Sequence, residues 1–286
     1  MQARTLPFHD PETGTYSYVV SDPATRRAAI VDPVLDYDPR GARTSTAGVD
    51  AITRYVQAEG LQIEWLLETH AHADHLSAAA VLKDRHGGRI GIGAGVRSVQ
   101  ATFRELLDLG ASLPADGSQF DHLFADGETF RIGNIEARVL ATPGHTSDSI
   151  TYLVGNAAFI GDTLFAPDYG TARCDFPGGD ARELHASVRK LYALPPETLL
   201  YLCHDYPPPG REPRPAWSVR EQSERNVMLN GTTSAEAFVA ARRARDATLA
   251  VPTLLLPAIQ VNLRAGRLPP PAANGRSYLK IPINAL

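Results

Sequence analysis

The feature that most constrains this chain is a dense run of metal-ligand residue types directly after an apolar segment. The run is THAHADH, residues 69–75, and it contains His70, His72, Asp74 and His75. A strand is predicted over 61–68 before it and an Ala-rich helix over about 76–85 after it. Neutral imidazole and carboxylate are ligands of borderline divalent metals, and no other function needs both at this density. We therefore expect a metal site at the end of a strand.

The spacing within the run indicates how these residues converge. Residues two apart point to the same side of an extended strand, so His70 and His72 are expected to face one side. The turn into the following helix would then bring Asp74 and His75 beside them.

Three further candidate ligands each come directly after a predicted strand: His145, Asp162 and His204. Ligands at several strand ends can converge on one edge of a sheet, where a rigid scaffold meets mobile loops. A site at such an edge can be both held and open. The remaining histidines have no partner nearby in the sequence, and we interpret them as ordinary polar residues: His9, His86, His122 and His185.

The composition argues against several classes of function. The 286 residues carry 28 Lys+Arg against 32 Asp+Glu, which disfavours a nucleic-acid or anionic-membrane surface. No apolar run reaches the ~18 residues of a transmembrane helix, and the first residues do not resemble a signal peptide. Two cysteines, Cys174 and Cys203, are too few for a disulfide framework. We therefore expect a soluble, cytoplasmic protein.

The predicted elements form two groups of strands with interleaved helices. Strands are predicted at 16–20, 28–31, 61–68, 129–132, 135–141, 149–154, 157–160 and 198–202. Helices are predicted at 49–56, 76–85, 96–109, 181–191, 217–229 and 234–245, and the stretches 35–48 and 269–282 are predicted to be irregular. This order favours a layered α/β arrangement over a doubly wound sheet. No nucleotide-binding glycine motif follows any strand.

The run THAHADH, followed by His145, Asp162 and His204 in that order, resembles the metallo-β-lactamase superfamily. The resemblance implies an αββα sandwich with the metal site along one edge of the two sheets. It covers about residues 14–230, so we expect one domain over 1–286 with a helical and Pro-rich extension at 231–286. The superfamily motif alone is compatible with thioester, lactone or β-lactam hydrolysis, RNA cleavage and oxygen chemistry.

Further segments resemble the persulfide dioxygenases within that superfamily, and most of all their longer bacterial, β-lactamase-like hydrolase (Blh) branch. These segments are Glu68 to Ala79, GTARCDFPGG at 170–179, Cys203 to Tyr206, LPAIQVN at 256–262 and YLKIP at 278–282. The resemblance implies an enzyme that oxidises glutathione persulfide with O₂ to sulfite and glutathione, using one non-haem Fe(II) per chain. Sulfide detoxification would be its role.

The same resemblance assigns the iron to His70, His145 and Asp162, a two-His-one-carboxylate set that leaves positions open for substrate and O₂. It makes His72, Asp74, His75 and His204 catalytic supporting residues that orient ligands and handle protons. In dizinc relatives these four positions complete a second metal site, so zinc or a second metal there stays open.

Arg173 is predicted to bind the substrate, because glutathione is an anion and guanidinium pairs with carboxylate bidentately. The alternative for Arg173 is a structural salt bridge with Asp175 or Asp180. Tyr169 and Tyr206 are further substrate-binding candidates, with packing as the alternative. Cys174 and Ala172 replace a threonine and a glycine of the mitochondrial-type relatives. We expect Cys174 to be a small buried neighbour of the site, with sulfur transfer as the alternative. Cys203 is expected in the core.

Two rival functions remain at this point. The first is a hydrolase of glutathione thioesters of the glyoxalase II kind, with two metal ions and a bridging hydroxide. The second is a non-catalytic metal or persulfide sensor, which full metal loading without turnover would support. Expected partners are small molecules, with no nucleic acid and no membrane. A homodimer is also considered, in which the Pro-rich tail would wrap around a neighbouring chain.

Overall fold

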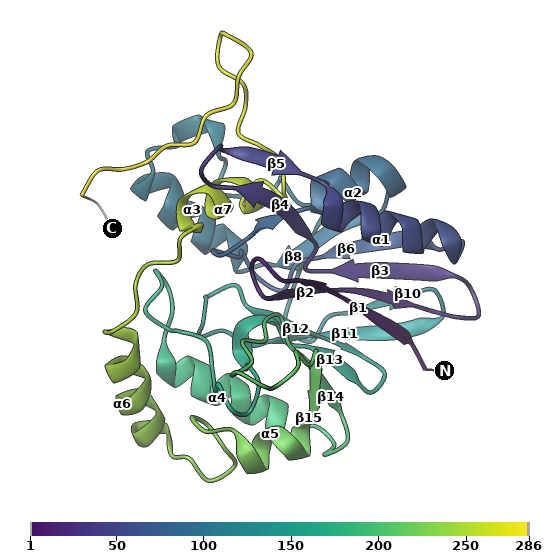
Figure 1. The fold of residues 1–286 in the computed structure, drawn as a ribbon, viewed down its shortest axis with the longest axis vertical. Helices are drawn as coiled ribbons and strands as arrows, with labels where there is room; N and C mark the ends of the chain where they lie inside the picture. The colour runs from purple at the N-terminus through teal and green to yellow at the C-terminus, as the bar shows by residue number, and fades with distance from the viewer. Residues whose placement is uncertain (1, 285–286) are drawn as a thin grey trace.

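The computed structural model describes residues 2–284 as two six-stranded sheets packed face to face, with helices on both outer faces. Figure 1 shows the layers, with α1, α2, α3 and α7 above the sheets and α4, α5 and α6 below them. The predicted αββα sandwich is therefore confirmed.

The first sheet has the strand order β1-β2-β3-β6-β8-β9. Its strands are β1 (Arg4–Asp10), β2 (Thr15–Ser21), β3 (Arg27–Val31), β6 (Gln62–Leu67), β8 (Arg89–Gly93) and β9 (His122–Phe124). The helices of its outer layer are α1 (Ala47–Ala58), α2 (Ala79–His86), α3 (Val96–Leu106) and α7 (Leu255–Asn262). The strands from β3 to β9 are parallel, so their carboxyl ends lie at one edge.

The second sheet has the strand order β10-β11-β12-β13-β14-β15. Its strands are β10 (Thr129–Ile132), β11 (Ile135–Ala141), β12 (Ile150–Val154), β13 (Ala157–Phe159), β14 (Leu199–Tyr201) and β15 (Ala216–Ser218). Its outer layer comprises α4 (Ala181–Tyr192), α5 (Val219–Arg225) and α6 (Ala235–Asp246). A small sheet of β5 (Arg43–Ser45), β4 (Val34–Asp38) and β7 (Leu76–Ser77) lies beside the first sheet.

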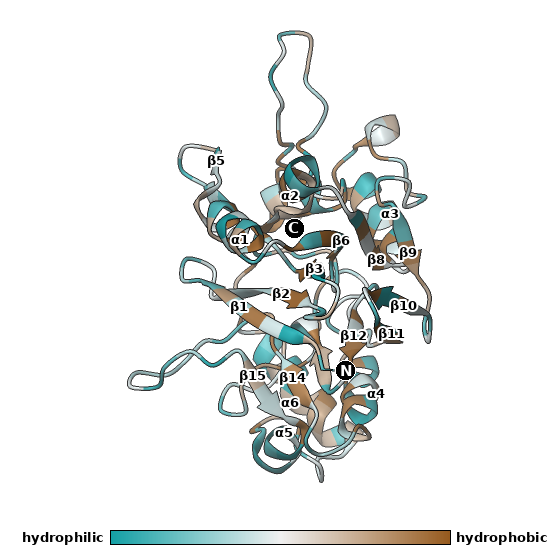
Figure 2. Cartoon of the chain, turned by 90° about the vertical axis from the view of Figure 1, so that its right-hand side faces the viewer, coloured by the Kyte–Doolittle hydropathy of each residue, from teal (hydrophilic) through white to brown (hydrophobic). Residues whose placement is uncertain are grey.

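Aromatic residues fill the space between the two sheets. Tyr18, Trp65 and Phe124 come from the first sheet, and Tyr152 and Phe159 come from the second. Residues alternate between buried and exposed along β11, as a strand with one face in a core requires. In Figure 2 the strands β9 and β12 are largely hydrophobic in colour, whereas helices α2 and α3 carry hydrophilic colour.

Most elements with a strong sequence pattern were predicted correctly, but the predictions for two segments were wrong. The stretch 35–48 is not a loop, because β4 and β5 pair as a hairpin whose turn is held by Asp38 accepting from the amides of Arg40 and Gly41. The predicted helix 217–229 begins as strand β15, and α5 starts only after Ser218, which caps it with Glu221 in a capping box.

Other elements were shorter than predicted or were not predicted. The predicted helix 76–85 starts with β7, and α2 begins at Ala79. Strands β1, β8 and β9 and helix α7 had no predicted counterpart. The Pro-rich stretch 269–282 has neither helix nor strand, as expected. Within residues 2–284 no helix is both long enough and apolar enough to cross a membrane.

Candidate metal centre

The predicted ligands gather at one edge of the sandwich because each follows the end of a strand. His70, His72 and His75 follow β6 of the first sheet. His145 follows β11, Asp162 follows β13 and His204 follows β14, all in the second sheet. Gly161 allows the close approach of the two sheets, since its φ is +51° and a Cβ there would lie 2.5 Å from the Thr69 hydroxyl oxygen. The edge therefore collects ligands from both sheets.

Two sets of candidate ligands lie side by side at this edge. The ligand atoms of His70, His145 and Asp162 all lie within 4.8 Å of one another, and so do those of Asp74, His75 and His204. Asp162 faces both sets. Its Oδ2 lies 4.0 Å from Nε2 of His70 and 3.6 Å from Nε2 of His145, whereas its Oδ1 lies 3.5 Å from Nε2 of His204.

The four histidines of these sets are oriented by partners at Nδ1. His70 contacts the Thr69 hydroxyl at 3.0 Å and His204 contacts the Thr15 hydroxyl at 3.2 Å. His145 donates to the carbonyl of Arg173 at 2.7 Å, and His75 faces the carbonyl of Leu76 at 3.3 Å. Such partners fix the ring orientation and leave Nε2 free to bind a metal.

The atoms that face the centre fit a metal ion. Nε2 of His70, Nε2 of His75 and Oδ1 of Asp162 are buried without a hydrogen-bond partner among the described residues. A buried polar atom without a partner is costly, and a bound cation would remove that cost. Burial, together with the charge of His72, holds the pKa of His70 well below its ordinary value and that of His75 at about 3. Both rings are therefore neutral, as metal ligands must be.

His72 takes a different role from His70. Its Nε2 lies 3.0 Å from Oδ1 of Asp32 and 3.4 Å from Oε2 of Glu68, beneath the centre. Burial opposes protonation of His72, but the Asp32 carboxylate and Cys203 together raise its pKa well above the ordinary value. The rings of His70 and His72 are neighbours, with centroids 4.0 Å apart, but the two residues do not share a ligand set. Nδ1 of His72 is buried without a hydrogen-bond partner among the described residues.

Asp74 and His204 form a close pair at the floor of the centre. Nε2 of His204 lies 2.9 Å from Oδ2 of Asp74. Burial opposes the charge on each residue, but their mutual attraction lowers the pKa of Asp74 and raises the pKa of His204.

A layer of supporting residues, which we did not predict, lies beneath the ligands. Asp32 accepts from the Thr69 amide at 2.8 Å and from the Thr69 hydroxyl at 2.9 Å, and Glu68 accepts from the Ser77 hydroxyl. The signal for Asp32 was its place after a predicted strand at the same edge as the ligands. Because Asp32 lies 38 residues before His70 in the sequence, its contact with the ligand run could not be predicted from local spacing.

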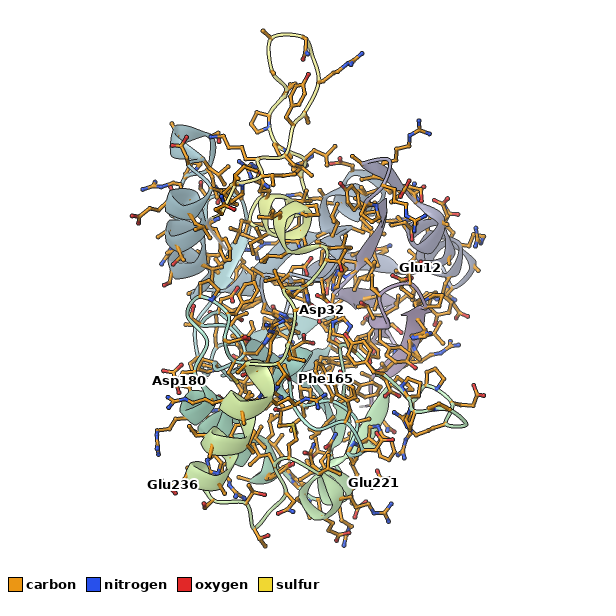
Figure 3. All side chains as sticks on the ribbon, turned by 60° about the vertical axis from the view of Figure 1, so that its left-hand side comes forward. Glu12, Asp32, Phe165, Asp180, Glu221 and Glu236 are labelled. Carbon is orange, nitrogen blue, oxygen red and sulfur yellow. The ribbon has the colours of Figure 1, made fainter. Side chains whose placement is uncertain are left out.

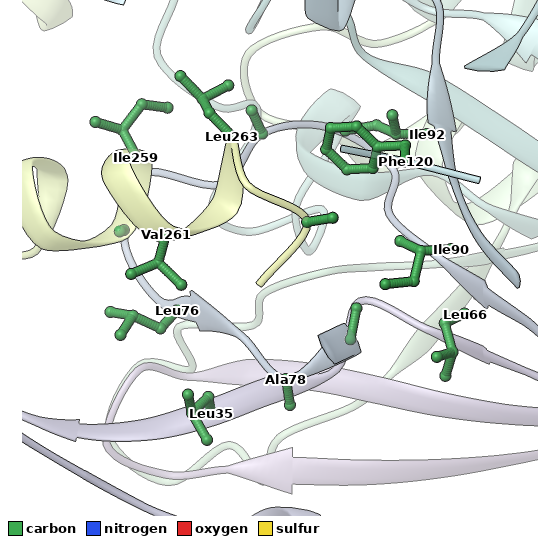
Figure 4. Packing of buried hydrophobic residues seen from close by; sticks show 14 of the residues in the cluster. Leu35, Leu66, Leu76, Ala78, Ile90, Ile92, Phe120, Ile259, Val261 and Leu263 are labelled. Carbon is green, nitrogen blue, oxygen red and sulfur yellow. The ribbon is translucent and has the colours of Figure 1, made fainter. Parts of the chain in front are cut away.

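Helix α7 supports the ligand loop from the far end of the chain. The side-chain amide of Asn262 donates to the carbonyls of His72 and His75, each at 2.8 Å, and its oxygen accepts from the Ser77 amide at 2.7 Å. Figure 4 shows α7 packed over β7, with Val261 above Leu76. Nothing in the local sequence around Asn262 indicates this role.

A pocket of about 740 Å³, including its open mouth, lies over the centre. Asp74, His145 and Asp162 line its floor. Tyr169 and Tyr206, predicted to bind substrate, line its walls together with Phe165. In Figure 3 Phe165 and Asp32 are labelled in the middle of the molecule, and α6 passes in front with Glu236 at its lower end.

Arg173 also lines this pocket, but its guanidinium is engaged. It pairs bidentately with Asp175, Nε to Oδ1 at 2.6 Å and Nη2 to Oδ2 at 2.8 Å, and its Nη1 donates to the carbonyl of Ala250. This is the salt bridge considered as the alternative. Cys174 is buried, which raises its thiol pKa, and Cys203 is in the core as expected.

The histidines interpreted as ordinary polar residues lie outside both ligand sets. His86 contacts the Thr53 hydroxyl, His122 contacts Glu128 and His185 contacts the carbonyl of Thr233. His9 packs against the ring of Tyr16. No potential metal-binding group among the described residues includes any of them.

The chain is similar to known metallo-β-lactamase-like proteins over most of its length. A family profile described as the metallo-beta-lactamase superfamily matches residues 10–204. The chain is 52% identical to a probable metallo-hydrolase of Burkholderia pseudomallei, with 98% of each chain covered. It is also 52% identical to a beta-lactamase hydrolase-like protein of Xylella fastidiosa, where 99% of this chain spans only 65% of that protein.

More distant similarities include two named activities. The chain is 45% identical to a protein named glyoxylase B2 from Dictyostelium discoideum, with 100% and 98% of the two chains covered. It is 29% identical to the human mitochondrial persulfide dioxygenase ETHE1, with 92% and 89% covered. The crystal structure of ETHE1 from Myxococcus xanthus is similar with a TM-score of 0.73 and 32% identity, covering 93% of this chain and all of that one.

Proposed function

Because the chain belongs to the metallo-β-lactamase superfamily, we propose that it is an Fe(II)-dependent persulfide dioxygenase, which oxidises glutathione persulfide with O₂ to sulfite and glutathione. In the balanced reaction, persulfide, O₂ and water give sulfite and thiol. The terminal sulfur is oxidised and O₂ is reduced. The S–S bond breaks and the thiol leaves with a proton.

One observation carries this proposal. His70, His145 and Asp162 form a compact ligand set, while Nε2 of His72 is turned to Asp32 and Glu68. Two histidines and one carboxylate are typical of non-haem Fe(II) oxygenases, although the same set also occurs in catalytic zinc sites. Such a set would hold one Fe(II) ion per chain with open positions for persulfide sulfur and O₂. The similarity to the two ETHE1 proteins supports the same function.

The chain's own residues have separate tasks in this reaction. The Arg173 carbonyl keeps Nε2 of His145 aimed at the centre through the 2.7 Å hydrogen bond to Nδ1. His204 and Asp74, 2.9 Å apart, are placed to hold and deliver the proton that the thiol product needs. Phe165, Tyr169 and Tyr206 wall the pocket with rings that limit water around the reacting sulfur.

A second function is favoured by the position of Asp162. One of its oxygens faces His70 and His145 and the other faces His204, as a carboxylate shared between two metal ions would. This arrangement, with Asp74, His75 and His204 as the second ligand set, suits a dinuclear hydrolase of glutathione thioesters. The names of the Burkholderia and Dictyostelium relatives support this candidate.

The test is turnover of the two substrate classes by one preparation. Protein loaded anaerobically with Fe(II) is given glutathione persulfide in an oxygen electrode, and an acylglutathione in a parallel thiol-release assay. We expect oxygen uptake with the persulfide, reduced at least about a hundredfold in His145→Ala because a metal ligand is lost. His185→Ala, which removes a histidine outside the centre, should retain the uptake. Thioester cleavage without oxygen uptake, by protein holding two metals per chain, would favour the hydrolase.

A further inference from the structure

Three arginines line the pocket over the metal centre, and they differ in what their guanidinium groups already bind. They are Arg173, Arg242 and Arg245. A guanidinium whose donors are all engaged by protein acceptors has a structural role, whereas one without a carboxylate partner can bind an anionic ligand. Sorting the three by their partners therefore separates structural from substrate-binding roles.

Two of these arginines are engaged with the protein. Arg173 is paired bidentately with Asp175. Arg242 is buried, with Nε 2.9 Å and Nη2 2.6 Å from Oδ1 of Asp246, and its Nη1 donates to the carbonyl of Thr171 at 3.1 Å. Asp246 in turn accepts from the Cys174 amide at 3.1 Å. Arg242 and Asp246 thus tie α6 to the loop 170–179, and neither Arg173 nor Arg242 has a free bidentate face.

Arg245 is the third and is different. It is exposed, and none of the ion pairs within residues 2–284 involves it, whereas its neighbour Arg242 is paired with Asp246. Its guanidinium carbon lies 5.5 Å from the ring centre of Tyr169, a cation–π distance. Tyr169 therefore supports the group from one side while its donors remain available. In Figure 3 the end of α6 opposite Glu236, which carries Arg245, lies near the level of Phe165.

The distribution of charged and metal-binding residues in the pocket indicates how a substrate would be oriented in it. The pocket floor carries the candidate metal ligands Asp74 and Asp162, while Arg245 is the arginine of the pocket lining that has no carboxylate partner among residues 2–284. A substrate with a sulfur at one end and a carboxylate elsewhere would place the sulfur at the floor. Its carboxylate would be attracted to the guanidinium of Arg245.

We infer that Arg245, supported by the ring of Tyr169, binds a carboxylate of a peptide-like thiol substrate and makes the site specific for carboxylate-bearing thiols. This assignment rests on the proposed function for the identity of the sulfur compound. It transfers to Arg245 the role that the sequence predicted for Arg173. Arg173 and Arg242 instead shape the wall against which the substrate lies.

The test is a binding measurement that does not require turnover. The affinity of metal-loaded protein for reduced glutathione, and for its diethyl ester in which both carboxylates are blocked, is measured by titration calorimetry. Arg245→Met should weaken glutathione binding about ten- to one-hundredfold, the value of a charge-assisted hydrogen bond, and leave the ester within about twofold. Arg245→Lys, which keeps the charge without the fork, should fall between the two.

Arg243→Met is the matched control. Arg243 lies two residues away on the same helix and is exposed, but it lines a different cavity beside Asp180. The control removes the same charge and should bind glutathione like the parent protein. Unchanged glutathione binding in Arg245→Met, an equal loss for the ester, or an equal loss in Arg243→Met would each overturn the assignment.

Oxygen uptake with glutathione persulfide, measured on the same variants, separates this inference from the proposed function. A protein that binds glutathione in an Arg245-dependent way but consumes no oxygen would contradict the dioxygenase and leave the carboxylate site standing. A protein that oxidises the persulfide with an unchanged KM in Arg245→Met would support the dioxygenase and contradict the carboxylate site.

Discussion

At the residue scale, the role of each histidine depends on which ring nitrogen is engaged. His70 and His72 are two positions apart in one run, and the sequence predicted both at the same side of the site. Asp32 decides the difference, because it accepts from Thr69, which orients His70, and it also holds Nε2 of His72. Asp32 does this from the left-handed backbone region, with a φ of 47°. Aspartate and asparagine tolerate this conformation better than most residues.

Asp32 offers a first test of this arrangement. In Asp32→Ala the His72 ring and the Thr69 amide and hydroxyl lose their buried partner, which should cost about 3–5 kcal/mol in the free energy of unfolding. Asp32→Asn keeps the backbone conformation and an acceptor oxygen, so it should cost clearly less. Urea unfolding of the metal-free proteins measures both values. Equal costs for the two variants would contradict this expectation, because they would show that the acceptor oxygen and the backbone conformation kept by Asn contribute nothing to the stability of the loop.

At the element scale, the strand ends were predictable and their supports were not. Apolar runs followed by turn residues located the strands that deliver His145, Asp162 and His204, so the site could be assembled from local patterns. Strands β4, β5 and β15 are short and acquire their structure by pairing, β4 with β5 as a hairpin and β15 with β14, and so few residues show no periodicity that a sequence pattern could detect. The contact of α7 with the ligand loop could not be detected either, since Asn262 lies 187 residues from His75.

Asn262 tests whether α7 supports the ligand loop. In Asn262→Leu the carbonyls of His72 and His75 and the amide of Ser77 lose their partners in the protein interior. An unsatisfied buried group costs about 1–3 kcal/mol, so unfolding should become easier by at least that amount. The metal should also dissociate faster during dialysis against a chelator. Asn274→Leu, at an exposed position in the Pro-rich stretch, should change neither property; a similar change in both variants would argue against this support.

At the scale of the whole molecule, the centre joins the two halves of the sandwich. His70 comes from the first sheet, and His145 and Asp162 come from the second. A resemblance of the ligand run to a known superfamily was enough to predict this architecture, because the order of ligands along the chain reflects the order of strand ends. The pairing of Arg173 with Asp175 and the free guanidinium of Arg245 depend on side-chain packing, which the sequence alone does not show.

Metal binding should therefore stabilise the whole fold. A ligand that binds only the folded state at a hundredfold excess over its Kd adds about 2.7 kcal/mol to the free energy of unfolding. We expect Tm to rise on adding Fe(II) under anaerobic conditions and to fall back on adding a chelator. His70→Ala should lose the rise and His185→Ala should keep it. The same rise in His70→Ala would place the stabilising ion outside the predicted ligand set.

The central claim is that this centre passes O₂ to a persulfide sulfur. The most direct measurement is the ratio of O₂ consumed to sulfite formed when iron-loaded protein is given fresh glutathione persulfide. We expect equal amounts of the two, with glutathione released in the same amount and with both signals lost in His145→Ala. Release of thiol with no oxygen consumed, or oxygen consumed without sulfite, would contradict it.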